Sequence, residues 1–282
     1  MTAPLAAYLA LQPSSRRDLA YASACVLVTV ALSWGPADDF EQLERAWVVL
    51  LTAGIAIVLL VGGRRGWVAT SLGALGLAGG AAAILMVATH LTLGKVAGAV
   101  EQHYFTPARS LVDLVAPVGN PARESLNTSL LAVVGALSRV LPGVVLLQSL
   151  AAQALAWALY HRIARAPRGE PVGALAGFRF NDHLIWGVAL SLVAVLLPRL
   201  GWARALGGNL LLFFGGLYLV RGVAVLAAVA SAVGFTGLVA SAVVLVGTVL
   251  LWWILAPALV VLGLTDTLVD WRVRLARAVG KP

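Results

Sequence analysis

Seven long apolar stretches, separated by short polar segments, are the feature that most restricts how this chain can fold. A helix needs about 20 apolar residues to cross the hydrocarbon core of a bilayer. The segments that reach or approach this length are 19–34, 46–63, 67–89, 143–161, 183–198, 207–231 and 236–256. Charged residues make up only 11% of the chain, whereas soluble domains carry about 25%. The sequence therefore predicts an all-α, polytopic transmembrane helical bundle and excludes a soluble enzyme, a disordered chain and a secreted disulfide scaffold.

The basic residues are expected to mark the cytoplasmic side of the membrane. The net charge of +8 does not indicate nucleic acid here, because the arginines form short clusters between apolar runs, next to anionic lipid headgroups. These clusters are Arg16-Arg17, Arg64-Arg65, 162–168 and 272–277. Arg16-Arg17 also resembles a twin-arginine export signal, but no A-x-A cleavage site follows. We expect a protein of the bacterial cytoplasmic (inner) membrane with a cytoplasmic N-terminus.

The C-terminal part decides whether the chain has seven or eight spans. Counting seven spans places the basic tail outside, against the positive-inside rule. Trp252-Trp253 marks an interface, and Pro257 is expected to break the helix. Residues 258–270 then fold back, either as an eighth crossing or as a short re-entrant segment. Both arrangements return the tail to the cytoplasm.

The outer stretch 90–124 is expected to contain short interfacial helices rather than a plain loop. Thr106-Pro107 and Asn120-Pro121 each combine a capping residue with a proline at the first helical position. We expect one short helix to begin at each pair. The whole chain is interpreted as one membrane domain, 1–282, with three parts: 1–89, the outer loop 90–140, and 141–282.

Few polar groups lie inside the apolar runs, and these are the candidate ligand-binding residues. Arg221 lies near the middle of its span, where a charge costs at least about 2.5–3.5 kcal/mol, and Asp266 is its expected partner. The pair is either structural or in contact with a ligand. Asn209, at the predicted start of the same span, either caps the helix or binds. Gln148 and Gln153 either bond to neighbouring helices or contact a ligand.

The sequence predicts neither catalysis nor a cofactor. His90 and His103 have no carboxylate or histidine neighbours at the spacing of metal ligands, and the single Cys25 excludes an internal disulfide. The nucleophile-elbow, zinc-protease and phosphate-loop motifs are absent from the sequence. We therefore expect a protein that is not an enzyme and that carries no metal.

Small residues are expected at helix contacts. Gly73, Gly76 and Gly80 lie on one helical face and would let another helix approach closely. Ala20 and Ala24 form a second pair with this spacing.

The second half of the chain, about residues 120–277, resembles the YybS-like predicted bacterial membrane proteins, whose function is uncharacterised. The resemblance depends on two blocks: Gly208-Asn209-Leu210-Leu211, and the ending from Leu262-Gly263-Leu264-Thr265-Asp266 to Asp270-Trp271-Arg272. Two positions depart from the family pattern. Asn181-Asp182 replaces the usual proline before the fifth span, and these two residues are expected to act as helix caps. Arg221 stands where the family tends to have glutamine.

That family is distantly similar to the substrate-binding membrane subunits of energy-coupling-factor transporters, and this implies a function. Such subunits bind a small solute under outer loops, and the Ala20/Ala24 pair resembles their docking motif. The resemblance implies a pocket under residues 90–140, lined by Gln148, Asn209 and Arg221. The alternative is a structural or accessory subunit of a larger membrane assembly, whose polar groups pair among themselves. The expected partners are membrane lipids, other membrane subunits and a small solute.

Overall fold

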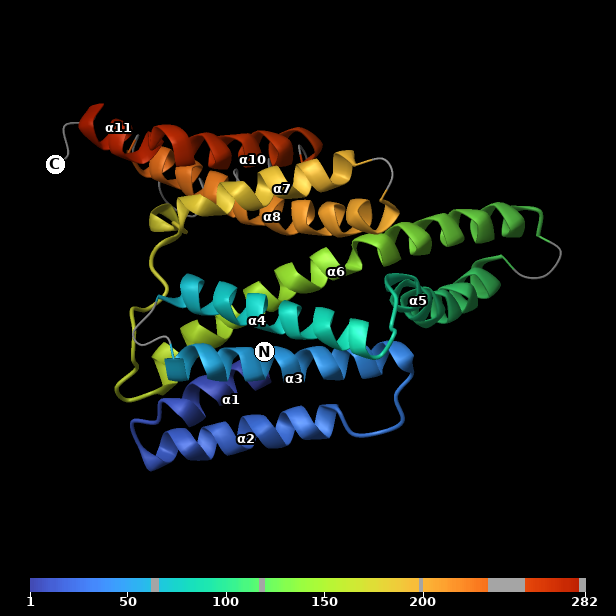
Figure 1. Cartoon of the computed structure of the whole chain (residues 1–282), viewed down its shortest axis with the longest axis horizontal. Coiled ribbons are helices and arrows are strands. Elements are labelled where there is room, and N and C mark those ends of the chain that lie inside the picture. The colour runs from blue at the N-terminus through green and yellow to red at the C-terminus, as the bar shows by residue number, and fades with distance from the viewer. Residues whose placement is uncertain (62–65, 117–119, 198–199, 233–251, 279–282) are drawn as a thin grey trace. The chain divides into compact units, whose positions relative to one another are not determined.

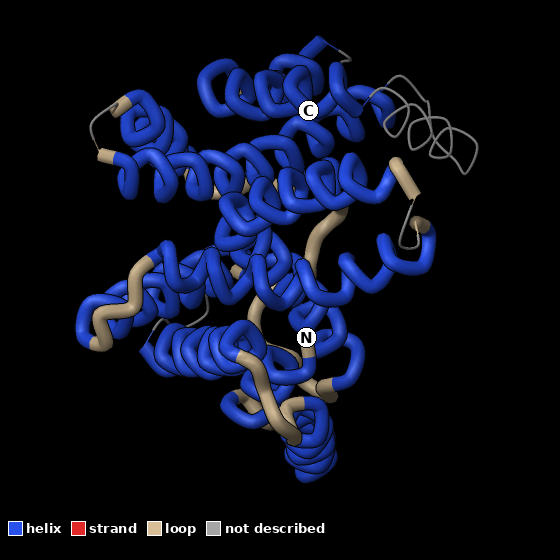
Figure 2. Tube along the Cα trace, turned by 90° about the vertical axis from the view of Figure 1, so that its right-hand side faces the viewer, coloured by secondary structure: helices blue, strands red, loops and turns tan. Residues whose placement is uncertain are grey.

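The computed structural model of the chain describes residues 1–61, 66–116, 120–197, 200–232 and 252–278. Within these ranges the chain is helical and has no strand (Figure 2), which confirms the predicted all-α class. The chain divides into two compact units, Met1–Val172 and Gly173–Pro282, here named unit 1 and unit 2. The expectation of one membrane domain over residues 1–282 stays a prediction.

Unit 1 is a bundle in which α6 and the short first helix make many of the contacts. The described helices are α1 (Thr2–Leu11), α2 (Arg16–Leu32), α3 (Asp39–Val61), α4 (Trp67–Ala88), α5 (Leu93–Val115) and α6 (Ala122–Ile163). Helix α1 packs against α2, α3 and α6, while α4 packs against α3 and α6 (Figure 1). Helix α1 was not expected from the sequence. Its Tyr8 and Leu9 are fully buried, so this short helix belongs to the core of unit 1.

Unit 2 is built around α8. Its described elements are the 3-10 turns η1 (Leu175–Gly177) and η2 (Asp182–Leu184) and the helices α7 (Ile185–Leu196), α8 (Gly201–Ala232), α10 (Trp252–Val269) and α11 (Trp271–Ala278). Helices α7, α10 and α11 and the turn η1 all pack against α8. Asn181 caps η2, since its Oδ1 accepts from the His183 amide at 3.0 Å. This confirms the capping role expected for Asn181.

Four described helices are long and apolar enough to cross a membrane: α3, α4, α6 and α8. They correspond to the predicted spans 46–63, 67–89, 143–161 and 207–231. The predicted spans 19–34 and 183–198 are helical as α2 and α7, but these helices are shorter. The predicted span 236–256 lies outside the described residues except for its last five positions. The count of seven to eight spans therefore stays a prediction.

Two prolines do not act as the sequence indicated. Pro107 lies inside α5, which begins after Thr92, so the prediction of a helix starting at Thr106-Pro107 is wrong. The Thr106 hydroxyl donates back to the Gln102 carbonyl, as it does in a helix interior. Pro257 lies inside α10, so the expected break at this position is also wrong. A proline costs a helix one hydrogen bond, but surrounding helices can compensate for that loss in a membrane protein.

Helix α6 joins two elements that the sequence had separated. The helix expected to begin at Asn120-Pro121 does begin there, and Asn120 Oδ1 accepts from the Ala122 amide at 2.9 Å. It then continues without interruption through Pro142 to Ile163 over 42 residues. The outer helix and the fourth span are therefore one helix, and the interpretation of 90–140 as a loop with short helices is wrong.

Helices of unit 1 approach each other closely at two glycines, and one of these was singled out from the sequence. A Cβ added at Gly54 of α3 would lie 2.6 Å from the Ala74 carbonyl oxygen of α4, and one at Gly73 would lie 3.2 Å from Val58. A Cβ at Gly76 or Gly80 would meet no described atom within 4 Å. Ala20 and Ala24 are exposed. Among the predicted small-residue contacts within unit 1, the structure supports Gly73.

Candidate functional site

Arg221 lies in the middle of α8, and its guanidinium is buried between two carboxylates and an aromatic ring. Its Nε donates to Oδ2 of Asp266 at 2.9 Å, and its Nη1 donates to Oδ1 of Asp182 at 2.7 Å. The guanidinium carbon is 5.2 Å from the centre of the Phe180 ring, within cation–π range. Because only 3% of the side chain is exposed, its charge requires such partners. The predicted pairing of Arg221 with Asp266 is confirmed.

Asp266 of α10 is the centre of this network, because two arginines donate to the same oxygen. Arg272 of α11 donates from Nη2 to Oδ2 of Asp266 at 2.7 Å, and the Asp266 side chain has no exposed surface. Arg272 Nη1 also donates to the carbonyl oxygens of Ala176 and Phe178, at 3.2 and 2.9 Å. One arginine thus connects α10 to the segment that precedes α7.

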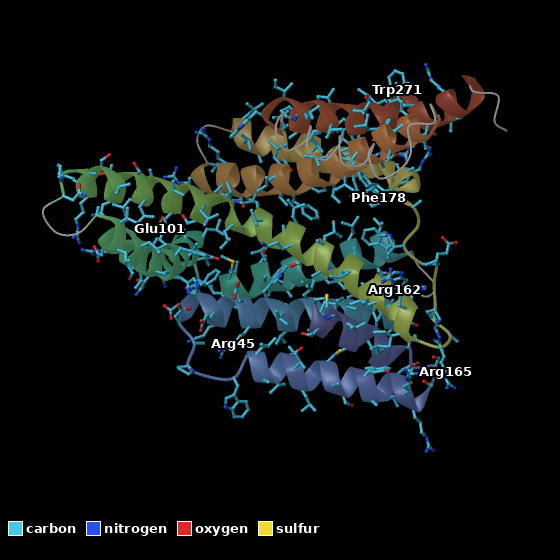
Figure 3. All side chains as sticks on the ribbon, turned by 180° about the vertical axis from the view of Figure 1, so that it is seen from behind. Arg45, Glu101, Arg162, Arg165, Phe178 and Trp271 are labelled. Atoms are coloured by element: carbon cyan, nitrogen blue, oxygen red, sulfur yellow. The ribbon has the colours of Figure 1, made fainter. Side chains whose placement is uncertain are left out.

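The junction between α10 and α11 brings Arg272 back toward Asp266. Asp270 ends α10 with a positive φ of 47°, a left-handed conformation that Asp adopts more readily than most residues. Arg179 donates to both Asp270 oxygens, at 3.2 and 2.7 Å, and Trp271 Nε1 donates to Thr265 Oγ1 at 3.2 Å. Phe178 and Trp271 lie at the same end of unit 2 (Figure 3). The ending Asp270-Trp271-Arg272 therefore contributes two ion pairs and three further hydrogen bonds to this end.

Two glycines set the distance between the helices that carry Arg221 and Asp266. A Cβ added at Gly222 of α8 would lie 1.9 Å from the Leu259 carbonyl oxygen, and one at Gly263 of α10 would lie 2.0 Å from the Tyr218 carbonyl oxygen. The two backbones are thus in direct contact, which only glycine permits. Arg221 directly precedes Gly222, and Asp266 lies three residues after Gly263. The close approach therefore brings the two charged side chains within hydrogen-bond distance.

The network balances its charges and extends from the interior of unit 2 to its surface. It comprises three arginines and three aspartates: Arg179, Arg221, Arg272, Asp182, Asp266 and Asp270. Asp182 is 64% exposed, whereas Asp266 is fully buried. Within the described ranges, no group of three or more His, Cys, Asp or Glu could hold a metal ion.

Gln148 and Asn209 are also predicted from the sequence to bind a ligand. Gln148 belongs to α6 of unit 1 and is exposed. Asn209 is buried in α8, where its Nδ2 donates to the Ala205 carbonyl oxygen at 2.9 Å. Because α8 begins at Gly201, the prediction that Asn209 caps this helix is wrong. Ligand contact by Gln148, Asn209, Arg221 or Asp266 stays a prediction.

Sequence reasoning missed three of the six network residues as site residues and gave a fourth a different role. Arg179, Asp270 and Arg272 were not identified as partners, and Asp182 was interpreted only as a cap. One signal was present, since Asp266, Asp270 and Arg272 all lie in the ending from Leu262 to Arg272 that was singled out for the family resemblance. That spacing places Asp266 and Asp270 one helical turn apart, but it does not reveal which arginine each one meets.

The described helices and their buried, self-paired charges define the class as an integral membrane protein with several apolar helices. Residues 3–267 match the model of the predicted membrane protein family DUF2232, and the chain belongs to that family. A match to the chain was found neither among curated proteins nor among solved structures. The expected likeness to YybS-like proteins and to energy-coupling-factor subunits stays a prediction.

Proposed function

We propose that this protein is a non-catalytic structural or accessory subunit of a larger membrane assembly. One observation carries the proposal: the buried charges of unit 2 are paired with one another. Arg221 has two carboxylates, and Asp266 has two arginines. A ligand carboxylate at Arg221 would have to compete with Asp182 and Asp266, which already accept from it. At Asp266 both arginines donate to Oδ2, while its buried Oδ1 has no partner among the described residues. The network therefore favours a fixed helix arrangement over exchange with a ligand.

A buried network of this kind is suited to fixing the geometry of helices. Buried ion pairs add little net stability compared with well-packed apolar side chains, but they can specify one arrangement among several. Here the network ties α8, α10 and α11 to the segment 176–182. We propose that unit 2 presents a rigid surface to neighbouring membrane subunits.

The arrangement of basic residues in unit 1 supports a cytoplasmic N-terminus in the bacterial inner membrane. The Ala166 amide donates to Ser14 Oγ at 3.2 Å, so the turn before α2 contacts the segment after α6. This contact brings Arg16 and Arg17 to the end of unit 1 that also carries Arg162 and Arg165 (Figure 3). All four arginines are exposed. Four exposed arginines at one end are what the positive-inside rule expects of a cytoplasmic face.

Small-solute binding, as in energy-coupling-factor subunits, is the second candidate function. It is supported by Gln153, which the sequence had singled out, and by two residues that the sequence had not indicated. Three buried polar side chains of unit 1, Tyr8, Ser71 and Gln153, have no hydrogen-bond partner among the described residues.

Native purification tests the proposed function. The full-length tagged chain is extracted in a mild detergent, and its co-purifying proteins are identified and quantified by mass spectrometry. We expect stoichiometric membrane subunits with no ATPase among them. The Asp266→Asn chain should lose these subunits, whereas the Asp270→Asn chain, altered at the exposed pair, should retain them. A stoichiometric ATPase, or a chain that purifies alone from native membranes, would contradict the proposal.

A further inference from the structure

The interior of unit 1 contains three polar side chains whose hydrogen-bonding atoms have no partner within the described residues. They are Tyr8 of α1, Ser71 of α4 and Gln153 of α6, and each is fully buried. The two hydroxyl oxygens and both polar atoms of the Gln153 amide are without a partner. Buried polar atoms are nearly always hydrogen-bonded, and leaving one unpaired is costly. Several such atoms in one unit therefore require a physical explanation.

These three side chains converge on one region of the unit. Gln153 lies one helical turn before Trp157 on the same face of α6. The ring of Tyr8 packs edge-on against Trp157, with 5.1 Å between the ring centres. The Ser71 hydroxyl lies close enough to the Tyr8 hydroxyl to interact with it, but the two oxygens do not reach the geometry of a hydrogen bond. Because α1 and α4 both pack against α6 (Figure 1), the three groups face the interior that these helices enclose.

The polar residues next to Gln153 on α6 are already engaged. Ser149, one turn before Gln153, accepts from Trp47 Nε1 at 2.9 Å. Trp157, one turn after it, donates from Nε1 to the Glu170 carbonyl oxygen at 2.9 Å. The face of α6 thus holds a row of buried polar groups in which Gln153 is flanked by satisfied neighbours. A partner for Gln153 has to come from elsewhere.

We propose that Tyr8, Ser71 and Gln153 form a binding site for a small uncharged molecule that both donates and accepts hydrogen bonds. The Gln153 amide offers two donors and one acceptor oxygen, and each hydroxyl offers a donor and an acceptor. A primary amide or an alcohol has complementary groups. This proposal is independent of the ion-pair network of unit 2.

The surroundings specify an uncharged occupant. Among the described residues of unit 1, Asp18 is the one charged side chain that is buried, and its carboxylate already accepts from Ser14 and Ser15. His161 lies eight residues after Gln153, roughly 12 Å along the helix. An ion bound by the Gln153 amide would have no neighbouring counter-charge, and burying an unpaired charge is strongly unfavourable.

Two kinds of molecule can donate and accept these hydrogen bonds: a small solute and water. A buried water makes about three hydrogen bonds to polar groups that would otherwise be unpaired, which also fits these three side chains. The experiment therefore needs one arm for each of them. Acetamide serves as the solute probe, and acetate, which has nearly the same shape but a negative charge, serves as its control.

The test uses the full-length chain, purified in a mild detergent, and four variants. Gln153→Leu removes the buried amide at nearly constant volume, and Tyr8→Phe and Ser71→Ala each remove one hydroxyl. Gln102→Leu is the matched control, because it makes the same substitution at an exposed position of the same unit. Binding of radiolabelled acetamide and acetate is measured by equilibrium dialysis. Contact between water and the Gln153 side-chain amide is measured by nuclear magnetic resonance, and unfolding temperatures are recorded for every chain.

For a solute site, we expect saturable acetamide binding, no acetate binding, loss of binding in Gln153→Leu and unchanged binding in Gln102→Leu. Tyr8→Phe and Ser71→Ala should each weaken binding about tenfold, the effect of one hydrogen bond. For a water site, acetamide does not bind, the Gln153 amide contacts water, and Gln153→Leu lowers the unfolding temperature. The proposal is overturned if neither occupant is detected and Gln153→Leu raises the unfolding temperature, because the amide was then merely unpaired.

Discussion

Replacement of Asp266 by asparagine tests whether the buried network holds α8, α10 and α11 together. Asparagine keeps the shape of the side chain and one acceptor oxygen, so the substitution removes chiefly the negative charge. In the native chain this charge faces Arg221 at 2.9 Å and Arg272 at 2.7 Å, and none of the Asp266 side chain is exposed. Without this charge, Arg221 and Arg272 lose the carboxylate to which both of them donate.

The expected loss of stability follows from the remaining contacts. Removing one partner from a buried ion pair costs about 3–5 kcal/mol. Arg221 keeps Asp182, and Arg272 keeps two backbone carbonyl oxygens, so we expect the lower end, about 3 kcal/mol. The Asp270→Asn chain is the matched control, since Asp270 and Arg179 are each nearly half exposed. An exposed pair contributes about 0–1 kcal/mol.

The assay compares the two variants with the native chain by denaturant unfolding in a mild detergent, followed by tryptophan fluorescence. We expect Asp266→Asn to lose at least three times as much unfolding free energy as Asp270→Asn. Equal losses in the two variants would refute the reasoning, because burial of Asp266 would then not determine the cost. A stabilised Asp266→Asn chain would refute it as well.

Three further predictions concern packing, pH and a buried hydrogen bond. Gly222→Ala should lower the unfolding free energy by about 3 kcal/mol, because its methyl group overlaps the backbone of α10. A methyl group at Gly215 meets no described atom within 4 Å, so Gly215→Ala should be neutral or stabilising in the same unfolding assay. Hydrogen bonds from Ser14 lower the pKa of Asp18. The contribution of Asp18 to stability is therefore present above the ordinary carboxyl pKa near 4 and is lost as the pH falls below it. Between pH 6 and pH 3, the unfolding temperature of Asp18→Asn should drop less steeply than that of the native chain. Ser149→Ala should cost about 1 kcal/mol, since it leaves the Trp47 indole N–H unpaired, and an unchanged unfolding free energy would contradict this.

The long apolar helices were predictable because lipid leaves the backbone little choice. A chain in hydrocarbon must satisfy its amides and carbonyls within the segment, so composition alone identified the helices later seen as α3, α4 and α8. Their ends were less predictable, since α8 starts six residues before its apolar run. The predictions at Pro107 and Pro257 were wrong because the residues next to a proline in the sequence do not show which helices surround it in the fold.

The sequence by itself determined that Arg221 must be paired, because the cost of burying a charge belongs to the residue and its apolar surroundings. It did not determine that Asp182 and Arg272 share in that pairing. Contacts among α8, α10, α11 and the segment before α7 decided this, through backbone approaches at Gly222 and Gly263 that local patterns do not encode. For Gln153, too, the sequence determined one part and the tertiary structure decided the other. The sequence placed an amide in an apolar helix, and only the positions of α1, α4 and α6 left it without a partner among the described residues.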